Sequence, residues 1–474
     1  MNALPLSRRA LLSRAANGFG ALALGALLQP ASRALAGPGP DPLTPRPAHF
    51  RPRARNVIFL FMEGGVSQVD SFDPKPRLTR HHGEDPRKAI GKLEKTQFEN
   101  VGTVFKSPWE FSQHGQSGLW ISNLFPHVAR HADKLCVLRS MTSAFPEHTS
   151  ANYFLHSGLG LQGRPSMGAW VAYGLGSSNH DLPGFVVLNG GLIPPGGVDC
   201  FGNGFLPATY QGTLVNAVGA PLPNVAAIEK DPARQSAKQR LAQRLNRAGL
   251  LRTPGDDALE SAIANAELAG RMQSAVPDFL DLSGESEATR QLYGCDAPYA
   301  PTRIYARECL LARRLIERGV RFVELTIPKI DGLDRWDAHS DILKNHGNNA
   351  RAVDQPIAGL LSDLQARGLL DDTLVVWSGE FGRTPFAQGS DGRDHHEHAF
   401  SVWLAGGGTR GGFAYGQTDD WGYRIAENPL QMHDLHATIL HLLGMDHTRL
   451  TYRFGGRDIR LTDVHGEVIQ AALA

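Results

Sequence analysis

The chain alternates short, continuous apolar runs with longer stretches in which apolar residues recur every three or four positions. Continuous apolar runs are typical of strands buried on both faces of a parallel sheet, and the second pattern is typical of helices. The predicted strands are residues 56–62, 135–138, 185–188, 320–327, 373–377 and 400–404, and the predicted helices include residues 303–318, 343–367 and 434–444. Their alternation predicts an α/β fold with a mostly parallel central sheet flanked by helices.

The same pattern suggests how the chain is divided. Large α/β enzymes exceed the usual length of a domain as single units, so we predict one domain over residues 56–474. Residues 228–300 lack strand signals and carry Leu259, Ile263, Leu268 and Met272 at helical spacing, which predicts an inserted helical layer. Residues 37–55 are rich in proline and arginine and are predicted to form a linker.

The amino-terminal segment has the three parts of an export signal. Ser7-Arg8-Arg9 precedes an apolar stretch from Gly18 to Leu28, and Ala34-Leu35-Ala36 supplies small residues at a cleavage site. We predict a twin-arginine signal over residues 1–36, use of the twin-arginine export machinery, and a periplasmic or secreted protein. The alternative is a basic, amphipathic start to an ordinary helix. No other run approaches about 18 apolar residues, so no membrane span is expected in the mature chain.

Charge and cysteine content narrow the classes of partner and site. The formal net charge is +1, so the overall charge favours neither a nucleic-acid partner nor an anionic membrane. The four cysteines show no C-x-x-C spacing, which argues against a thiolate zinc site. An exported protein can form disulfides, and Cys295 and Cys309 are the closest pair in sequence, but spacing does not decide whether they pair.

Metal-ligand chemistry is concentrated between the strands predicted at 373–377 and 400–404. Glu380 follows the first of these strands, after Ser378 and Gly379. Asp394, His395, His396 and His398 come just before the second strand. Carboxylates and imidazoles together suit a divalent transition metal. The alternative is a solvated, histidine-rich loop.

Two other predicted strands are also followed by acidic or histidine residues. Glu63 follows residues 56–62, and Asp337 and His339 lie about ten residues beyond residues 320–327. Since ligands of open α/β sheets bind at the carboxyl ends of the strands, we expect all three groups to converge there. The alternatives are that Asp337 caps the next helix and that His339 is solvated.

A fourth region, residues 145–158, is predicted to enter a helix that ends on glycine. His148, Thr149 and Ser150 lie near its start, where exposed amides and the helix dipole would attract a phosphate or sulfate group. The alternative is that Thr149 or Ser150 only caps the helix, which is the commoner role of such residues.

Several longer motifs carry a family resemblance. They are Leu60-Phe-Met-Glu-Gly-Gly-Val-Ser-Gln-Val-Asp-Ser-Phe-Asp-Pro-Lys-Pro76, Trp336-Asp-Ala-His339, Gly379-Glu-Phe-Gly-Arg-Thr-Pro385, Gly392-Arg-Asp-His-His396 and Leu450-Thr-Tyr-Arg-Phe-Gly-Gly-Arg-Asp458. With them the sequence resembles the bacterial family called domain of unknown function 1501. That family is similar to the alkaline phosphatase and sulfatase superfamily. The resemblance implies an alkaline phosphatase/sulfatase-like fold and hydrolysis of phosphate or sulfate esters at a metal site.

The resemblance also assigns positions. The first-strand aspartate of the superfamily matches Glu63, the nucleophile matches His148 with Thr149 beside it, and a late Asp-His pair matches Glu380-Phe381. The middle Asp and His match Asp337 and His339, and the later histidine matches His395 or His396. Glutamate thus replaces aspartate twice, no Ser, Thr or Cys stands at the nucleophile position, and the Cys-x-Pro-x-Arg signature of formylglycine sulfatases is absent.

The sequence therefore predicts an exported, metal-dependent hydrolase of sulfate or phosphate esters, acting on small-molecule or glycan substrates. The expected metal is zinc or manganese, with calcium as the alternative, and its ligands are Glu63, Asp337, His339, Glu380, His395 and His396. His148 or Thr149 would be the nucleophile or proton carrier. Arg383 would either clamp an oxyanion or form a structural salt bridge. The rival hypotheses are a non-catalytic exported protein that binds anionic glycans and a purely structural envelope protein.

Overall fold

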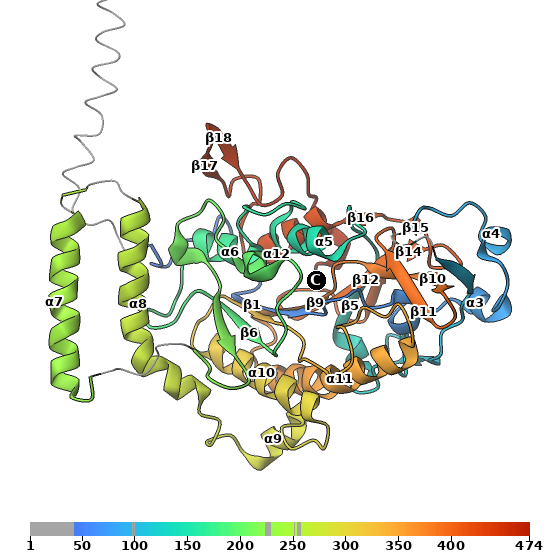
Figure 1. Ribbon diagram of the computed structural model, residues 1–474, viewed down its shortest axis with the longest axis horizontal. Helices are drawn as coiled ribbons and strands as arrows, with labels where there is room; N and C mark the ends of the chain where they lie inside the picture. Colours follow the sequence, from blue (N-terminus) through green and yellow to red (C-terminus); the bar gives the residue numbers. More distant parts are fainter. Residues whose placement is uncertain (1–41, 97, 99, 223–228, 251, 254–256) are drawn as a thin grey trace, which may run out of the picture.

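The computed structural model describes residues 42–474 except 97, 99, 223–228, 251 and 254–256. At its centre lies a nine-stranded sheet with the order β13-β5-β12-β9-β1-β8-β6-β7, in which β16 also pairs with β5 (Figure 1). The strands are β1 (Asn56–Phe61), β5 (Leu135–Thr142), β6 (Phe185–Asn189), β7 (Thr213–Asn216), β8 (Phe322–Leu325), β9 (Thr373–Ser378), β12 (Phe400–Ala405), β13 (Phe413–Tyr415) and β16 (Leu430–Gln431). All six predicted strands are present.

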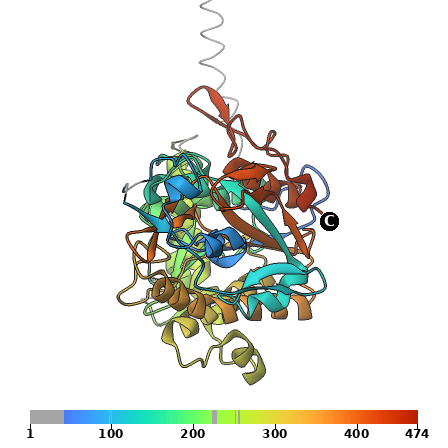
Figure 2. The same cartoon turned by 90° about the vertical axis from the view of Figure 1, so that its right-hand side faces the viewer.

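The sheet is parallel except around one strand. Strand β12 runs antiparallel to both of its neighbours, β5 and β9, whereas the pairs on either side of this strand are parallel. Helices α5 (His148–Ser157), α6 (Met167–Leu175) and α12 (Met432–Leu442) cover one face. Helices α10 (Ala300–Glu317) and α11 (Ile342–Ala366) cover the other, as Figures 1 and 2 show. The predicted α/β class, with a mostly parallel sheet flanked by helices, is confirmed.

The segment between β9 and β12, which the sequence predicts to be a loop, is instead a β-hairpin. Strands β10 (Gly382–Gln388) and β11 (Gly392–His396) pair antiparallel, and β10 also pairs with β2 (Val101–Val104) in a small second sheet. A short turn through Gly389, at φ 63°, joins the two strands. The register places Arg383 opposite His395 and Gly382 opposite His396. This hairpin carries several of the predicted site residues to the carboxyl edge of the central sheet.

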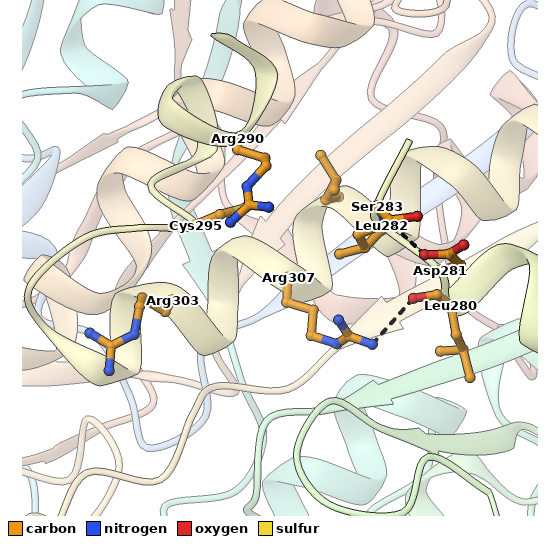
Figure 3. A pocket seen from close by; sticks show the side chains of 9 residues that line it. Leu280, Asp281, Leu282, Ser283, Arg290, Cys295, Arg303 and Arg307 are labelled. Carbon is orange, nitrogen blue, oxygen red and sulfur yellow. Dashed lines mark hydrogen bonds between the residues drawn. The ribbon is translucent and has the colours of Figure 1, made fainter. Parts of the chain in front are cut away.

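The region predicted to be an insertion contains α7 (Pro232–Leu250), α8 (Asp257–Leu280) and α9 (Glu287–Tyr293). Helices α7 and α8 stand side by side at the left edge of Figure 1, away from the sheet. Where α8, α9 and α10 meet, a surface pocket of about 400 Å³ opens (Figure 3). Leu280, Asp281, Leu282, Ser283, Arg290, Cys295, Arg303, Arg307 and Leu310 line it.

Other predictions concern the chain ends and the cysteines. The predicted export signal lies outside the described residues. Residues 42–55, predicted to belong to a linker, form no regular element but pack on the body, where Leu43 and Ala54 are buried. All four cysteines are free thiols, so Cys295 and Cys309 do not pair. Within the described ranges, no helix combines the length and the apolar character needed to cross a membrane.

Candidate metal centre

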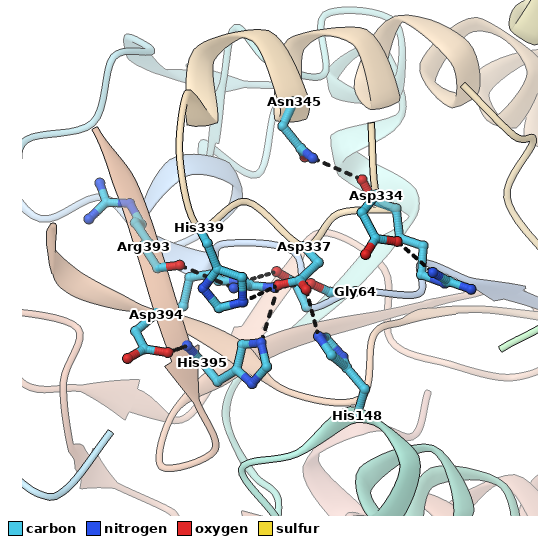
Figure 4. A network of polar contacts seen from close by, with 12 residues as sticks. Gly64, His148, Asp334, Asp337, His339, Asn345, Arg393, Asp394 and His395 are labelled. Atoms are coloured by element: carbon cyan, nitrogen blue, oxygen red, sulfur yellow. Dashed lines mark hydrogen bonds and ion pairs between the residues drawn. The ribbon is translucent and has the colours of Figure 1, made fainter. Parts of the chain in front are cut away.

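The predicted site residues meet around one carboxylate, that of Asp337. Its Oδ1 atom accepts a hydrogen bond from Nη2 of Arg383 and lies 2.9 Å from Nε2 of His339 and 3.2 Å from Nε2 of His395. Its Oδ2 atom lies 3.3 Å from Nε2 of His148, outside good hydrogen-bond geometry (Figure 4). Three imidazoles from a loop, a hairpin strand and a helix start therefore present the same ring atom to one aspartate.

The opposite nitrogen of each ring holds it in place. Nδ1 of His148 donates to Oε1 of Glu380 at 2.5 Å, and Nδ1 of His395 donates to the carbonyl oxygen of Pro146 at 2.7 Å. Nδ1 of His339 contacts Oε1 of Gln388. In metal sites, a ligating histidine almost always donates its other ring N–H to a carboxylate or carbonyl, which fixes the ring and its tautomer.

Local structure explains why His395 belongs to this cluster and His396 does not. Successive side chains of a strand point to opposite faces, so the two neighbours on β11 cannot both reach Asp337. Nε2 of His396 is instead 2.7 Å from the carbonyl oxygen of Tyr423, and its ring stacks on that of Tyr423 with centroids 4.8 Å apart. Burial lowers the pKa of His396 to about 3. Among the predicted ligands, His396 therefore lies outside the cluster around Asp337.

The protonation states sharpen the chemistry of the cluster. Burial lowers the pKa of His395 to about 4, so this ring is neutral at pH 7. With its N–H on the Pro146 carbonyl, His395 directs the lone pair of Nε2 at a carboxylate oxygen. Burial alone would raise the pKa of Asp337, but Arg383 and the imidazoles hold it well below its usual range. Two electron-rich atoms therefore face one another across 3.2 Å.

A divalent cation fits between these atoms. Nitrogen and oxygen ligands about 2.1 Å from a shared zinc ion lie roughly 3 to 3.4 Å apart, close to the separations seen around Asp337. One ligand atom each from His148, Asp337 and His395 lies within 4.8 Å of the others. His339, beside the same carboxylate oxygen, could supply a fourth ligand. The donor set fits a four-coordinate zinc or manganese ion better than calcium, which prefers six to eight oxygen ligands.

Glu63 and Glu380, both predicted ligands, border this cluster. Glu380 orients His148 and also accepts the backbone N–H of Gly64 at 3.0 Å. Glu63 is fully buried, its Oε1 atom accepts from Nε of Arg335, and its Oε2 atom has no hydrogen-bond partner among the described residues. Burial, opposed by Arg335, raises the pKa of Glu63 to about 7. Glu63 is therefore a carboxyl group that can gain or lose a proton near neutrality.

Arg383 matches the structural alternative predicted for it. Its Nε and Nη1 atoms donate to the carbonyl oxygens of Gly65 and Arg393 at 3.0 and 3.1 Å. Its Nη2 atom donates to the carbonyl oxygen of Gly64 and to Asp337. The side chain is fully buried. Because its donors are engaged within the fold, Arg383 positions Asp337 and is poorly placed to clamp a substrate oxyanion.

The start of α5 does not have the cap predicted from Thr149 or Ser150. Glu147 caps the helix, and its carboxylate accepts the N–H groups of Thr149 and Ser150 at 2.7 and 3.1 Å. The amides that would have attracted a phosphate or sulfate group are therefore bound by the chain itself. His148, the first residue of the helix, is the one that reaches the centre.

Three residues at the centre were not predicted. Arg335 pairs with Glu63 from a left-handed backbone conformation at φ 48°, and Gln388 orients His339. Phe98, which is 52% exposed, sets its ring at right angles to that of His339 with centroids 4.8 Å apart. None of them belongs to a ligand type or spacing that a sequence pattern would single out.

Comparison with known proteins places the chain in a family. The model of the family described as "Protein of unknown function (DUF1501)" matches residues 54–473. The chain belongs to this family. No curated protein sequence matches the DUF1501 chain.

Several solved structures are similar to the DUF1501 chain. One is a lipoteichoic acid synthase from Listeria monocytogenes, with 10% identity, a TM-score of 0.37, and coverage of 89% of this chain and 79% of that one. A sulfatase from Pseudoalteromonas sp. has 12% identity, a TM-score of 0.36, and coverage of 83% and 68%. The alkaline phosphatase of the Antarctic bacterium TAB5 has 9% identity, a TM-score of 0.36, and coverage of 83% and 99%. Likenesses this distant say nothing about the reaction of this chain.

Proposed function

We propose that this protein is an exported, metal-dependent hydrolase of sulfate or phosphate esters. The observation that carries the proposal is the convergence of three Nε2 atoms on the Asp337 carboxylate, each imidazole being held through Nδ1. Such rings are oriented before a cation arrives, so binding requires little rearrangement. When bound, a divalent metal supplies positive charge that stabilises a transferring phosphoryl or sulfuryl group and acidifies water.

The chain's own residues would divide the remaining work. Asp337, His148 and His395 bind the metal, with His339 beside them, and Glu380 and Arg383 hold His148 and Asp337 in place. Glu63, with a pKa of about 7, suits a group that takes a proton from water or returns one to the leaving group. The position where relatives of the superfamily carry a nucleophilic hydroxyl holds His148. Direct attack by water therefore fits this centre better than a covalent intermediate.

The first test is the metal content of the purified protein, followed by an ester screen. We expect about one zinc or manganese ion per chain, lost in a His148→Ala/His395→Ala variant and retained in the neighbouring His396→Ala variant. Metal-loaded protein should then hydrolyse p-nitrophenyl sulfate or p-nitrophenyl phosphate and release p-nitrophenol. Full metal content in the double variant would refute the site, and retained metal without turnover would refute the hydrolase.

One observation favours a second function. The expected nucleophile position holds His148, whose Nδ1 atom is bound to Glu380, and Thr149 is hydrogen-bonded to Glu147 through its amide and its side chain, so the centre could recognise an anionic glycan without cleaving it. Binding of a sulfated polysaccharide by metal-loaded protein that hydrolyses no ester would establish this alternative. Export is tested separately, because an Arg8→Lys/Arg9→Lys variant should remain in the cytoplasm if the twin-arginine route is used.

A further inference from the structure

Helix α7 packs with its polar side inward. Its neighbour in the fold is α8, and the partly buried side of α7 carries the amides Gln235, Gln239, Gln243 and Asn246. Nε2 of Gln235 donates a 3.0 Å hydrogen bond to Oε1 of Gln273 on α8. Figure 1 shows α7 as the outermost element at this edge of the molecule, with α8 between α7 and the body. A surface helix normally places its apolar side against the protein and its polar side in water. In α7 this arrangement is reversed.

Two of the three leucines of α7 face solvent. Leu241 is 57% exposed and Leu245 is 64% exposed, and their spacing of four residues places them one above the other on a single face. Arg234 and Lys238 continue the same stripe toward the start of the helix, each seven residues before one of the two leucines. The exposed face thus combines apolar side chains with long cationic ones.

The charge of α7 has one sign. Its residues 232–250 contain five cations, Arg234, Lys238, Arg240, Arg244 and Arg247, all exposed, and no acidic residue. The pairs of Lys238 with Glu229 and of Arg234 with Asp231 lie at the amino-terminal end, which leaves the cations around the leucines as the dominant charge. The net charge of the whole chain, +1, conceals this local excess.

We infer that the outward face of α7 binds the surface of an anionic phospholipid bilayer. A helix with exposed leucines among arginines lies in the interface plane, where the leucines enter the acyl boundary and the cations meet lipid phosphates. Two copies of α7 facing each other would bring five cations against five, so charge disfavours self-association. A soluble polyanion would use the cations but leave the leucines without a role. The inference does not depend on the proposed function.

Vesicle binding tests the inference on the full chain. The probes are vesicles of phosphatidylcholine with about a third phosphatidylglycerol, and pure phosphatidylcholine vesicles as the neutral control. We expect binding to the anionic vesicles that weakens as salt is raised. Arg240→Gln/Arg244→Gln/Arg247→Gln should weaken partitioning roughly a hundredfold, about fivefold per cation, and Leu241→Ser/Leu245→Ser should weaken it at least about tenfold.

Matched controls remove the same kinds of side chain elsewhere. They are Leu161→Ser, an equally exposed leucine, and Arg87→Gln/Lys88→Gln/Lys92→Gln, three exposed cations in and just after helix α4 (Pro86–Ala89). Both should bind vesicles as the unaltered chain does. The apolar amino-terminal segment is common to all variants, so differences among them report α7. Circular dichroism checks that each variant is folded.

Three outcomes would overturn the inference. The first is equal binding to neutral and anionic vesicles. The second is vesicle binding that heparin competes for and that the leucine substitutions leave unchanged, which would assign the face to a soluble polyanion. The third is a concentration-dependent dimer that the leucine substitutions dissolve, which would assign the face to a second copy of the chain.

Discussion

Two aspartates of this molecule, the fully buried Asp70 and the partly exposed Asp337, are each paired with an arginine of the β10–β11 hairpin, and they differ in what else they face. Asp70 receives Nε and Nη2 of Arg393 at 2.7 and 3.1 Å and the hydroxyl of Ser67 at 2.6 Å. Every contact of this carboxylate is with a donor. Asp337 receives Arg383 but also faces three imidazoles, of which His395 is neutral and directs a lone pair at it.

The difference separates a structural ion pair from a binding site. The Asp70–Arg393 pair is closed, because Arg393 also donates to the carbonyl oxygens of Thr384 and Phe105 and both side chains are fully buried. Asp337 is 15% exposed and its ring neighbours offer acceptors as well as donors. A buried charge alone therefore does not identify a site. A charge that has unpaired acceptor atoms beside it does identify a site, because only a cation or added protons can satisfy those atoms.

Breaking the closed pair should have the largest effect on stability. Asp70→Asn leaves Arg393 charged and buried without its partner, which costs about 3–5 kcal/mol of unfolding free energy. Urea denaturation followed by tryptophan fluorescence measures this loss. Metal content per folded molecule should stay unchanged. A loss below about 1 kcal/mol would show that Arg393 finds compensation elsewhere.

Breaking the open site should have the largest effect on metal affinity. Asp337→Asn removes the charge that all three rings face, and we expect more than about a hundredfold loss of affinity, beyond the usual cost of losing an orienting group. Unfolding free energy should fall less than in Asp70→Asn, because Arg383 keeps three backbone carbonyls. Competition with a chromophoric chelator gives the affinity, and chemical denaturation gives the stability. Equal stability losses in the two variants would erase the distinction.

Loosening one ring without removing it should have a smaller effect. Glu380→Gln keeps the shape of the side chain but replaces the charged acceptor of the His148 ring, and we expect a tenfold to hundredfold loss of metal affinity. The matched control is Glu397→Gln, a carboxylate nearby in sequence whose ion pair is with the exposed His398. If both substitutions weaken metal binding equally, general electrostatics and not ring orientation would be the cause.

The sequence predicts the sheet better than the hairpin, for a physical reason. Strands β1, β9 and β12 are continuous apolar runs, which have few other uses than a buried sheet. Strand β11, Gly-Arg-Asp-His-His, is just as buried, yet its side chains are satisfied by ion pairs and hydrogen bonds, so no apolar pattern marks it. The choice between His395 and His396 depends on the alternation of side chains along a strand, and the sequence pattern does not show that this segment is a strand.

The candidate ligands could be found from the sequence, but their supports could not. Asp337, His339 and His395 stand out in the sequence because their chemistry is rare and follows strand ends. The partners that orient them include a backbone carbonyl, at Pro146, and the amide of Gln388, which is common on surfaces. The sequence does not reveal the capping role of Glu147, because Thr149 and Ser150 are stronger signals for a cap. Such contacts depend on tertiary geometry alone.

The finest test of the open site is its proton balance. Burial alone would lower the pKa of His148, but its contacts with Asp337 and Glu380 raise it to about 9. In the metal-free protein, the stability contributed by this imidazolium is therefore complete below about pH 6.5, its unfolded value, and is lost as pH rises toward 9. The pH dependence of metal binding has the opposite sign, because a metal ion binds Nε2 of His148 only after this atom has lost its proton.

Metal affinity should accordingly rise about tenfold per pH unit between pH 6.5 and 9 and level off above that, with about one proton released per ion bound at pH 7.5. Calorimetry in buffers of different ionisation enthalpy counts the released protons. His148→Gln should abolish both the release and the slope, whereas His396→Ala should keep them. A full proton released by the His148→Gln variant would mean that a group other than His148 yields its proton to the metal.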